Sequence, residues 1–272
     1  MSYPYQGTAV ITGAGSGIGL ATAKALAARG MDLALVDRRA DRLEGARAAL
    51  ATNARCVTAH ALDVTDKDVV ADLPARITEG HPVVSVLMNN AGVAIGGNFE
   101  EIEPEDFDWL FEVNFHAPVR LTRAFLPTLR AAPKARIVNV SSIFGIVAPA
   151  GQTAYAASKF ALRGFSEALR HELEAEGSTV GITTVHPGGV ATNIAKDARA
   201  AKGWGADTME ERQRTAARLL KKPPDEAAAL IAEAIERDAP RLLVGADARI
   251  AAMIQRLFPV RHFKVIASRM GS

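Results

Sequence analysis

The sequence contains a single cysteine, Cys56, among its 272 residues. One thiol excludes an internal disulfide and fits a reduced compartment. The chain also lacks any uninterrupted apolar run near the roughly 18 residues that a membrane-spanning helix needs. Its N-terminus shows no basic segment followed by an apolar one, so no secretory signal is expected. We therefore predict a soluble, cytoplasmic protein with no integral membrane segment.

A charge bias is absent as well. Thirty-two Lys and Arg residues stand against thirty Asp and Glu residues, which gives a formal net charge of +2. This balance argues against nucleic acid as the main partner, and no metal site is predicted. Hydrophobic residues make up 49% of the chain. A core of that size in a chain of this length fits one large α/β domain over residues 1–272.

Strand-like and helix-like segments alternate from one end of the chain to the other. Strands are expected at 8–11, 33–36, 56–59, 83–88, 136–140, 181–185 and 242–244. Helices are expected at 20–29, 40–51, 66–79, 104–113, 116–130, 153–176 (closed by Gly177) and 225–237, with possible distortions at Pro74, Pro118 and Pro127. This alternation predicts a single Rossmann-type, doubly wound parallel sheet of about seven strands with helices on both faces.

A glycine-rich turn follows the first expected strand, in the sequence TGAGSGIG at 12–19. Glycine permits a tight turn and a close approach of the backbone to a ligand, and the N–H groups at the start of the next helix can bind a pyrophosphate. Asp37 ends the second strand about 20 residues further on, where a dinucleotide-binding fold places its ribose-binding acid. Strand, glycine turn, helix and acid together predict a dinucleotide site.

Tyr155 and Lys159 form a second pattern, because residues four apart lie on the same face of a helix. A phenol with a pKa of about 10 is a poor base at neutral pH, and a neighbouring ammonium favours its ionised form. Ser142 ends the fifth strand and is positioned to serve the same oxygen. A solvated surface pair is the ordinary alternative for Tyr and Lys at this spacing.

The position of these residues in the expected sheet decides between the two interpretations. Ligands of such sheets bind beyond the carboxyl ends of the strands. Polar residues or turns follow six successive strands at that edge: the glycine turn, Asp37, Asp63, Asn89, Ser142 and Pro187-Gly188. This convergence favours a catalytic Tyr155 and Lys159.

Over roughly residues 6–245 the chain resembles the short-chain dehydrogenase/reductase family. The matching motifs are TGAGSGIG (12–19), NNAG (89–92), Asn114, Ser142, YAASK (155–159) and PGGVAT (187–192). The resemblance implies that Tyr155 is the general acid/base, that Lys159 lowers its pKa and binds the nicotinamide ribose, and that Ser142 holds the substrate oxygen. It further implies that Asn114 supports a water-linked proton relay and breaks its helix locally.

The resemblance also implies a set of cofactor-binding residues. In chain order they are Thr12, Gly13, Ser16, Gly17, Ile18, Gly19, Asp37, Arg38, Asp63, Val64, Asn90, Ala91, Gly92, Tyr155, Lys159, Pro187, Gly188, Val190 and Thr192. Structural alternatives exist for three polar residues. Asn89 and Asn90 would hold strand ends together, and Asp63 would be an ordinary turn acid.

The sequence favours NAD over NADP. Asp37 would accept hydrogen bonds from the adenosine ribose and repel a 2′-phosphate, and the glycine turn has Ala14 and Ser16 rather than a cation. Arg38 and Arg39 argue the other way, because guanidinium groups bind phosphate.

We expect an enzyme that interconverts a secondary alcohol and a ketone, with a hydrophobic small-molecule substrate. Its expected pocket residues are mostly apolar: Val93, Ile95, Phe144, Val147, Gln152, Gly189, Trp204 and Met209. His116 and His186 flank the motifs and are expected to be structural. An NADP-dependent carbonyl reductase, a non-catalytic dinucleotide sensor and a nucleotide-sugar epimerase are the alternatives.

Two segments stand apart from this pattern. Residues 193–222 are expected to form a polar, mostly helical substrate lid with a Gly203-Trp204-Gly205 kink. The stretch 246–272 is basic and amphipathic, and would pack on its own domain, on another subunit or on a membrane surface. The family resemblance implies a homotetramer or homodimer.

Overall fold

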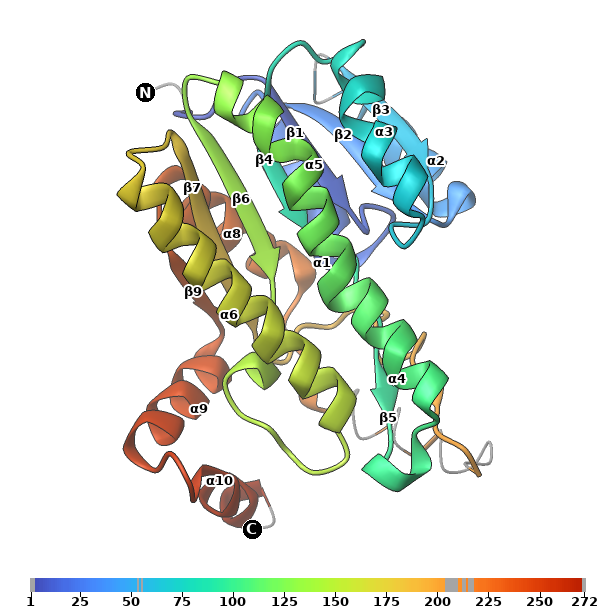
Figure 1. Ribbon diagram of the computed structural model, residues 1–272. Coiled ribbons are helices and arrows are strands. Elements are labelled where there is room, and N and C mark those ends of the chain that lie inside the picture. Colours follow the sequence, from blue (N-terminus) through green and yellow to red (C-terminus); the bar gives the residue numbers. More distant parts are fainter. Residues whose placement is uncertain are drawn as a thin grey trace.

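The computed structural model describes residues 3–52, 54, 56–203, 210–211, 214 and 218–270. Seven strands form one sheet in the order β3-β2-β1-β4-β6-β7-β9, and all neighbouring pairs are parallel (Figure 1). The strands are β1 Thr8–Thr12, β2 Asp32–Asp37, β3 Val57–Ala61, β4 Val84–Asn89, β6 Ala135–Val140, β7 Val180–Pro187 and β9 Arg241–Val244. The predicted Rossmann-type sheet is confirmed.

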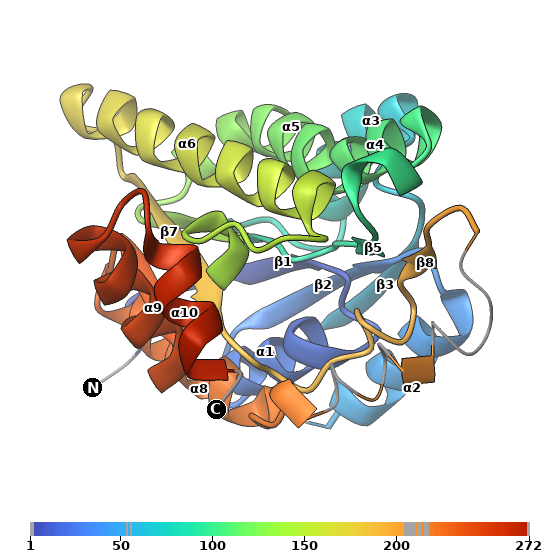
Figure 2. The same ribbon diagram turned by 90° about the horizontal axis from the view of Figure 1, so that it is seen from below.

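Helices cover both faces of the sheet (Figure 2). One layer holds α1 Gly17–Ala27, α2 Ala40–Leu50 and α8 Pro224–Glu236, and the other holds α3 Lys67–Thr78, α4 Pro104–Phe111, α5 Ala117–Ala131 and α6 Thr153–Ala175. Each layer packs its own apolar cluster against the strands. The chain reverses its direction of travel across the sheet between β1 and β4, which is where such sheets open a ligand crevice.

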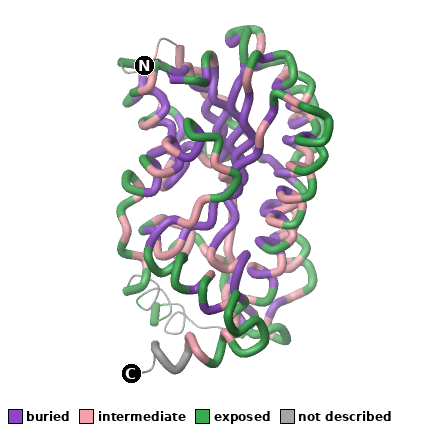
Figure 3. Tube along the Cα trace, turned by 90° about the vertical axis from the view of Figure 1, so that its left-hand side faces the viewer, coloured by how far each residue is buried: buried purple, intermediate pink, exposed green. Residues whose placement is uncertain are grey.

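The central strands are buried along their whole length because helices cover them on both sides. Every residue of β1, β4 and β6 is buried. Figure 3 shows this buried sheet as a continuous purple layer between helices whose outer faces are exposed. Continuous apolar runs of this kind are typical of parallel strands.

Three prolines disturb the helices less than expected. Pro74 and Pro127 lie inside α3 and α5, both of which continue past them. Pro118 lies in the first turn of α5, where its missing N–H costs little. The expected break at Asn114 is confirmed as a π-helical turn, Glu112–His116, between α4 and α5. Gly177 follows α6 with a φ of +64°, as expected for its closing residue.

The segment 193–222 is not mostly helical in its first part. Residues Arg199–Ala200 form a short strand, β8, that pairs in parallel with β5, Ile95–Gly96. Arg199 also forms an ion pair with Asp106, with 2.6 Å between nitrogen and oxygen, and lies over the Trp109 ring. Local pattern gave no sign of this strand, because two residues are too few for a periodicity. Trp204, Gly205 and Met209 lie outside the described residues.

The remaining elements are short helices. The 3-10 turns η1 Phe99–Glu101 and η3 Ile143–Gly145 follow β5 and β6, and the C-terminal stretch forms α9 Ala246–Leu257 and α10 His262–Met270. Within the described part of the chain, no helix is both long and apolar enough to cross a bilayer.

A charged cluster closes the amino edge of the sheet, opposite the predicted site. The Arg136 side chain is only 5% exposed and pairs with Asp238 at 2.8 Å. Arg136 also donates to the Tyr5 hydroxyl and to the carbonyl oxygen of Ile182. Lys134 and the Tyr5 hydroxyl bind the same Asp238 carboxylate. Burial raises the pKa of this carboxyl, but its hydrogen bonds with Lys134 and Tyr5 and the Arg136 charge outweigh burial and lower it.

Asp238→Asn is predicted to destabilise the fold by about 1–3 kcal/mol, because it leaves the buried guanidinium of Arg136 without its counter-charge. Asp238 has a φ of +56°, which asparagine also tolerates, so the change tests charge and not backbone strain. Urea unfolding at neutral pH measures the loss, with exposed Glu79→Gln as the matched control. The lowered pKa means that the difference shrinks as the pH falls through the carboxyl range. Equal midpoints for the two variants would contradict the prediction.

Candidate active site

Tyr155, Lys159 and Ser142 meet at the carboxyl end of β6. Lys159 lies one helical turn beyond Tyr155 in α6, and its Nζ is 5.6 Å from the centre of the Tyr155 ring. The Lys159 ammonium is 3% exposed and donates to the carbonyl oxygen of Val140 at 3.1 Å. The Ser142 Oγ accepts from the Phe144 N–H at 3.1 Å and lies close enough to Tyr155 to act on the pKa of its phenol. The surface-pair alternative is therefore wrong for Lys159.

Burial governs the charges at this cluster. It raises the pKa of Tyr155 to about 12, while the neighbouring Ser142 hydroxyl acts in the lowering direction. Burial also lowers the pKa of Lys159 to about 8. The expected lowering of the Tyr155 pKa by Lys159 is thus not what this structure shows, because loss of solvent outweighs any attraction between the two groups. A phenol with a pKa this high is protonated at neutral pH.

Asn114 is fully buried within the π-helical turn. Its Oδ1 accepts from the Val93 N–H and its Nδ2 donates to the Val93 carbonyl, both at 2.9 Å. Nδ2 also donates to Ser158 Oγ at 3.2 Å. A Cβ atom placed on Gly92 would lie 3.3 Å from Asn114 Oδ1 and 3.5 Å from Lys159 Nζ. Asn114 and Lys159 therefore approach the same point beside the NNAG loop, and Gly92 leaves that point open.

The glycine turn has the geometry of an anion cradle. Gly13 and Gly17 adopt φ of +65° and +55°, which side chains disfavour, and a Cβ on Gly19 would collide with the carbonyl oxygen of Gly13. Helix α1 starts at Gly17, three residues earlier than expected, and its N-cap residue Ser16 makes no side-chain capping bond. Its first N–H groups are thus available to a phosphate. Ile18 is buried beneath the turn.

Thr12 and Asn90 join the ends of β1 and β4. The Thr12 hydroxyl accepts from the N–H groups of Asn90 and Ala91, each at 3.0 Å. Asn90 Nδ2 donates to the carbonyl oxygens of Thr12 and Gly13. The strand-joining interpretation of Asn90 is thus supported by its contacts, and these bonds also fix the wall of the crevice. Asn89 binds Asn139 and Thr122 within the core.

Asp37 lies at the tip of β2 against the glycine turn. Its Oδ2 accepts from the Gly15 N–H and its Oδ1 from the Arg39 N–H, both at 2.9 Å. Arg38 is exposed beside it, and Arg39 pairs with Asp41. Asp63 is exposed, and its Oδ1 accepts from the backbone and hydroxyl of Thr65, as expected for a turn acid. Its neighbour Val64 is buried.

The PGGVAT turn follows β7. Pro187 ends the strand, Val190 is buried, and the side chain of Thr192 would lie 3.2 Å from a Cβ on Gly17. Gly188 and Gly189 leave no room for side chains, because Asp247 of α9 and the carbonyl oxygen of Leu219 fill that space. Asp247 accepts from the Gly189 N–H at 2.6 Å. The turn is thus held from the C-terminal side of the chain.

The two histidines have different settings. His186 is fully buried, and its Nδ1 donates to the carbonyl oxygen of Ser142 at 2.9 Å. Burial lowers the pKa of His186 to about 4. The prediction of a structural His186 is supported by these contacts. His116 is exposed at the end of the π-helical turn.

The residues expected to line the substrate pocket lie in different surroundings. Ile95 and Val147 are buried within separate side clusters of the core. Phe144 packs edge-on against Tyr155 with 6.1 Å between ring centres. Val93 and Gln152 are half-buried, and Val93 packs against the same cluster as Tyr155. Of the expected pocket residues, Val93 and Phe144 therefore lie close to Tyr155.

Sequence comparison agrees with this arrangement. The family described as short chain dehydrogenase matches residues 7–203. A relative named putative oxidoreductase SadH, from Mycobacterium tuberculosis, is 38% identical over 261 residues, covering 96% of this chain and 94% of its own. The chain belongs to the short-chain dehydrogenase family of oxidoreductases.

Solved structures of other short-chain dehydrogenases show the same fold. One from Burkholderia phymatum, in complex with NAD, has a TM-score of 0.86 and 30% identity, with 94% of this chain and 95% of that chain covered. An alcohol dehydrogenase from Thermococcus sibiricus, complexed with 5-hydroxy-NADP, has a TM-score of 0.72 and 27% identity, with 88% of this chain and 96% of that chain covered. Short-chain dehydrogenases similar to this one thus bind either dinucleotide.

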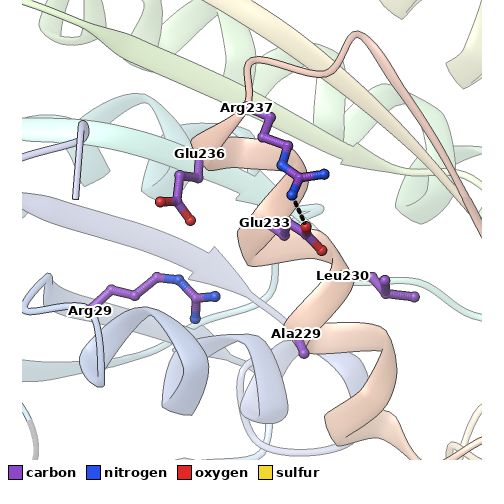
Figure 4. A pocket seen from close by; sticks show the side chains of 6 residues that line it. All are labelled: Arg29, Ala229, Leu230, Glu233, Glu236 and Arg237. Carbon is purple, nitrogen blue, oxygen red and sulfur yellow. Dashed lines mark ion pairs between the residues drawn. The ribbon is translucent and has the colours of Figure 1, made fainter. Parts of the chain in front are cut away.

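Two hollows of this short-chain dehydrogenase lie outside the catalytic cluster. One of about 410 Å³ is lined by Arg29, just after α1, and by residues at the end of α8, where Glu233 forms an ion pair with Arg237 (Figure 4). Both helix ends lie at the amino edge of the sheet, opposite Tyr155 and the glycine turn. Another, of about 420 Å³, is lined by Gly189, Lys222 and Asp247 and adjoins the PGGVAT turn.

Sequence reasoning missed two charged residues near the dehydrogenase site. Arg42 of α2 places its Cβ 3.0 Å from the position of a Cβ on Gly15 and pairs with Asp197 at 3.3 Å. Asp247 supports the turn after β7 from a helix 58 residues further along the chain. Neither belongs to a motif. Nothing in the local sequence pattern indicated either residue.

Proposed function

We propose that this short-chain dehydrogenase interconverts a hydrophobic secondary alcohol and its ketone by hydride transfer, with NAD as the favoured cofactor. The observation that carries the proposal is the buried Lys159 ammonium beside Tyr155 and Ser142, at the end of a crevice that begins at an open glycine turn. Four-residue spacing places both groups on one helical face, and the sheet turns that face toward the crevice.

The cofactor-binding role of the residues is supported by the space that they leave. The turn at Gly13, Gly17 and Gly19, with Ser16 and Ile18, would hold the pyrophosphate, and Asp37 would hold the adenosine ribose. Asp63, Val64, Asn90, Ala91 and Gly92 would line the adenine side, and Pro187, Gly188, Val190 and Thr192 the nicotinamide side. The bound dinucleotide would accept or supply the hydride.

The residues of this chain would then supply orientation and the proton. Ser142 holds the substrate oxygen beside the Tyr155 hydroxyl, and Tyr155 donates its proton to a ketone or removes one from an alcohol. Lys159 holds the ribose hydroxyls and stabilises negative charge on the phenol. Asn114, which approaches the same point as Lys159, supports proton exchange with solvent. Residues 193–222 would act as the lid, with Arg42–Asp197 and Arg199–Asp106 as closing ion pairs.

An NADP-dependent carbonyl reductase is the second candidate. Arg38 is exposed directly beyond Asp37, and the Cβ of Arg42 lies close to Gly15. Both guanidinium groups belong to the region that would face a 2′-phosphate. The Asp37 carboxylate, which already binds the Gly15 N–H, opposes that phosphate and favours NAD.

Asp37→Ala is predicted to shift cofactor preference toward NADP, because it removes the carboxylate that repels a 2′-phosphate. We expect the ratio of kcat/KM for NADP to that for NAD to rise at least about tenfold, which corresponds to about 1.4 kcal/mol. Steady-state assays of a panel of alcohols and ketones with each cofactor measure it. Asp72→Ala, at an exposed acid on α3, is the control. An unchanged ratio in Asp37→Ala would remove the basis for preferring NAD.

Tyr155→Phe is predicted to lower kcat by about 10² to 10⁴, the usual effect of a positioned proton donor. Dinucleotide binding, followed by fluorescence titration, should persist because the ring and Lys159 remain. Tyr3→Phe removes another buried hydroxyl, which donates to the carbonyl oxygen of Ala232 far from the site, and should leave kcat unchanged. Full activity in Tyr155→Phe would refute the proton-transfer role.

The two directions of the reaction are predicted to have opposite pH dependence. With the pKa of Tyr155 at about 12 and that of Lys159 at about 8, both groups are protonated at pH 7. Alcohol oxidation needs a proton to leave this pair, so its kcat/KM should rise with pH above neutrality. Ketone reduction needs the proton present, so its kcat/KM should fall over the same range. The apparent values belong to the coupled pair.

Initial rates in both directions between about pH 6 and pH 10 test this, because that range brackets the pKa of Lys159 at about 8. His186, whose pKa burial lowers to about 4, does not titrate in this range. Oxidation that slows as the pH rises from neutrality would contradict the assignment.

A further inference from the structure

The C-terminal helices gather most of the exposed large apolar side chains of the structure. Among the described residues, ten large hydrophobic side chains are exposed, and six of them lie within 14 residues: Ile250, Met253, Leu257, Phe258, Val260 and Phe263. Val260 is 91% exposed and Leu257 is 65% exposed. A cluster of this kind on one surface marks an interaction site more often than scattered exposure does.

The spacing of these residues shows that the surface is built and not accidental. Ile250, Met253 and Leu257 follow the three- and four-residue steps of one face of α9. The opposite face, at Ala248, Ala251 and Ile254, is buried. Ala251 and Ile266 pack with Ile146 and Val147, just beyond Ser142, so both helices are attached to the body of the protein. The outward apolar face of α9 is therefore not used in packing the helix against its own domain.

Basic side chains are interspersed with these apolar residues along α9 and α10. Arg249, Arg256, Arg261 and Lys264 are exposed beside the six apolar residues. Within the described part of the chain, none of these four cations has an ion-pair partner. The sequence from 248 to 272 contains no Asp or Glu. With five Lys and Arg residues in this stretch and a total net charge of +2, the rest of the chain has a formal charge of −3, so the excess of positive charge is local to this segment.

We propose that α9 and α10 dock this protein on an anionic lipid bilayer, with the six apolar side chains inserted at the boundary between headgroups and acyl chains. An amphipathic helix that carries apolar residues on one face and Lys or Arg beside them binds such interfaces through buried apolar area and electrostatic attraction. In Figure 1 the two helices project beyond the carboxyl end of the sheet, away from the core, so a flat surface can reach them.

A second copy of the chain fits the surface less well. A twofold interface would place the same patch on both subunits. Four arginine and lysine side chains would then face four others with no carboxylate between them. Anionic lipid supplies the missing negative charge and the apolar phase together, and docking does not depend on the proposed reaction.

Vesicle co-sedimentation of the full-length protein tests the proposal. Vesicles of phosphatidylcholine alone should retain little protein, and vesicles with phosphatidylglycerol as about a third of the lipid should retain it, less so at high salt. Leu257→Glu should lower the partition coefficient roughly tenfold or more, since it replaces an inserted side chain with an anion. Phe99→Glu makes the same change at a side chain that is also 65% exposed, in η1, and should have little effect.

The charged residues are tested separately. The Arg249→Gln/Arg256→Gln double variant should lose about thirtyfold in partitioning, at roughly fivefold per cation near an anionic surface. Lys24→Gln/Lys67→Gln, at two exposed lysines elsewhere, is the matched control. Thermal unfolding verifies that every variant is folded.

Three results would overturn the proposal. The first is a wild-type protein that stays in the supernatant with both kinds of vesicle. The second is equal binding by Leu257→Glu and Phe99→Glu. The third is self-association in analytical ultracentrifugation that Leu257→Glu abolishes, without vesicle binding, which would make this surface an interface between copies of the chain.

Discussion

A buried ammonium constrains the centre of this structure. Removing a charge from water is costly unless the protein supplies a partner, and Lys159 Nζ is met by the carbonyl oxygen of Val140 at the end of β6. The backbone of α6 is fixed there as well, because Ser141 Oγ donates to the carbonyl oxygen of Lys159. A Cβ on Gly145 would collide with Ser141 Oγ and approach the same carbonyl group. These contacts fix the position of the start of α6, and with it Tyr155, at the carboxyl end of β6.

Hydrogen bonds between buried polar side chains also align α6 with the neighbouring strands β4 and β6. Asn89 at the end of β4 donates to Asn139 in β6, and Asn139 donates to Ser166 in α6, both at 2.8 Å. Such bonds are directional, and an unmade one inside a core costs about 1–3 kcal/mol. Apolar packing alone tolerates small slips between elements, whereas these amides specify one alignment. The catalytic helix and the crevice wall are therefore held by polar contacts that lie beneath the site.

The sequence predicted the sheet, and it also placed Tyr155, Lys159 and Ser142 together, because both follow from local periodicity and from the polarity of parallel strands. Asp37 ends β2 and Ser142 follows β6, and these strand ends suffice to place them at one edge. Three features were beyond local reasoning. The β5–β8 pair joins residues about a hundred positions apart, Asp247 reaches Gly189 across the fold, and the protonation of Tyr155 depends on burial that a sequence does not display.

The C-terminal helices also contact the segments that surround the candidate site. Their inner residues pack on Ile146 and Val147, in the segment that leaves Ser142, and Asp247 at the start of α9 fixes the turn after β7. Contacts of α9 therefore reach the segments that follow both β6 and β7. Under the two proposals made above, a lipophilic alcohol or ketone would have a short path from a bilayer toward Tyr155, because the inner residues of the docking helices pack on the segment that follows Ser142.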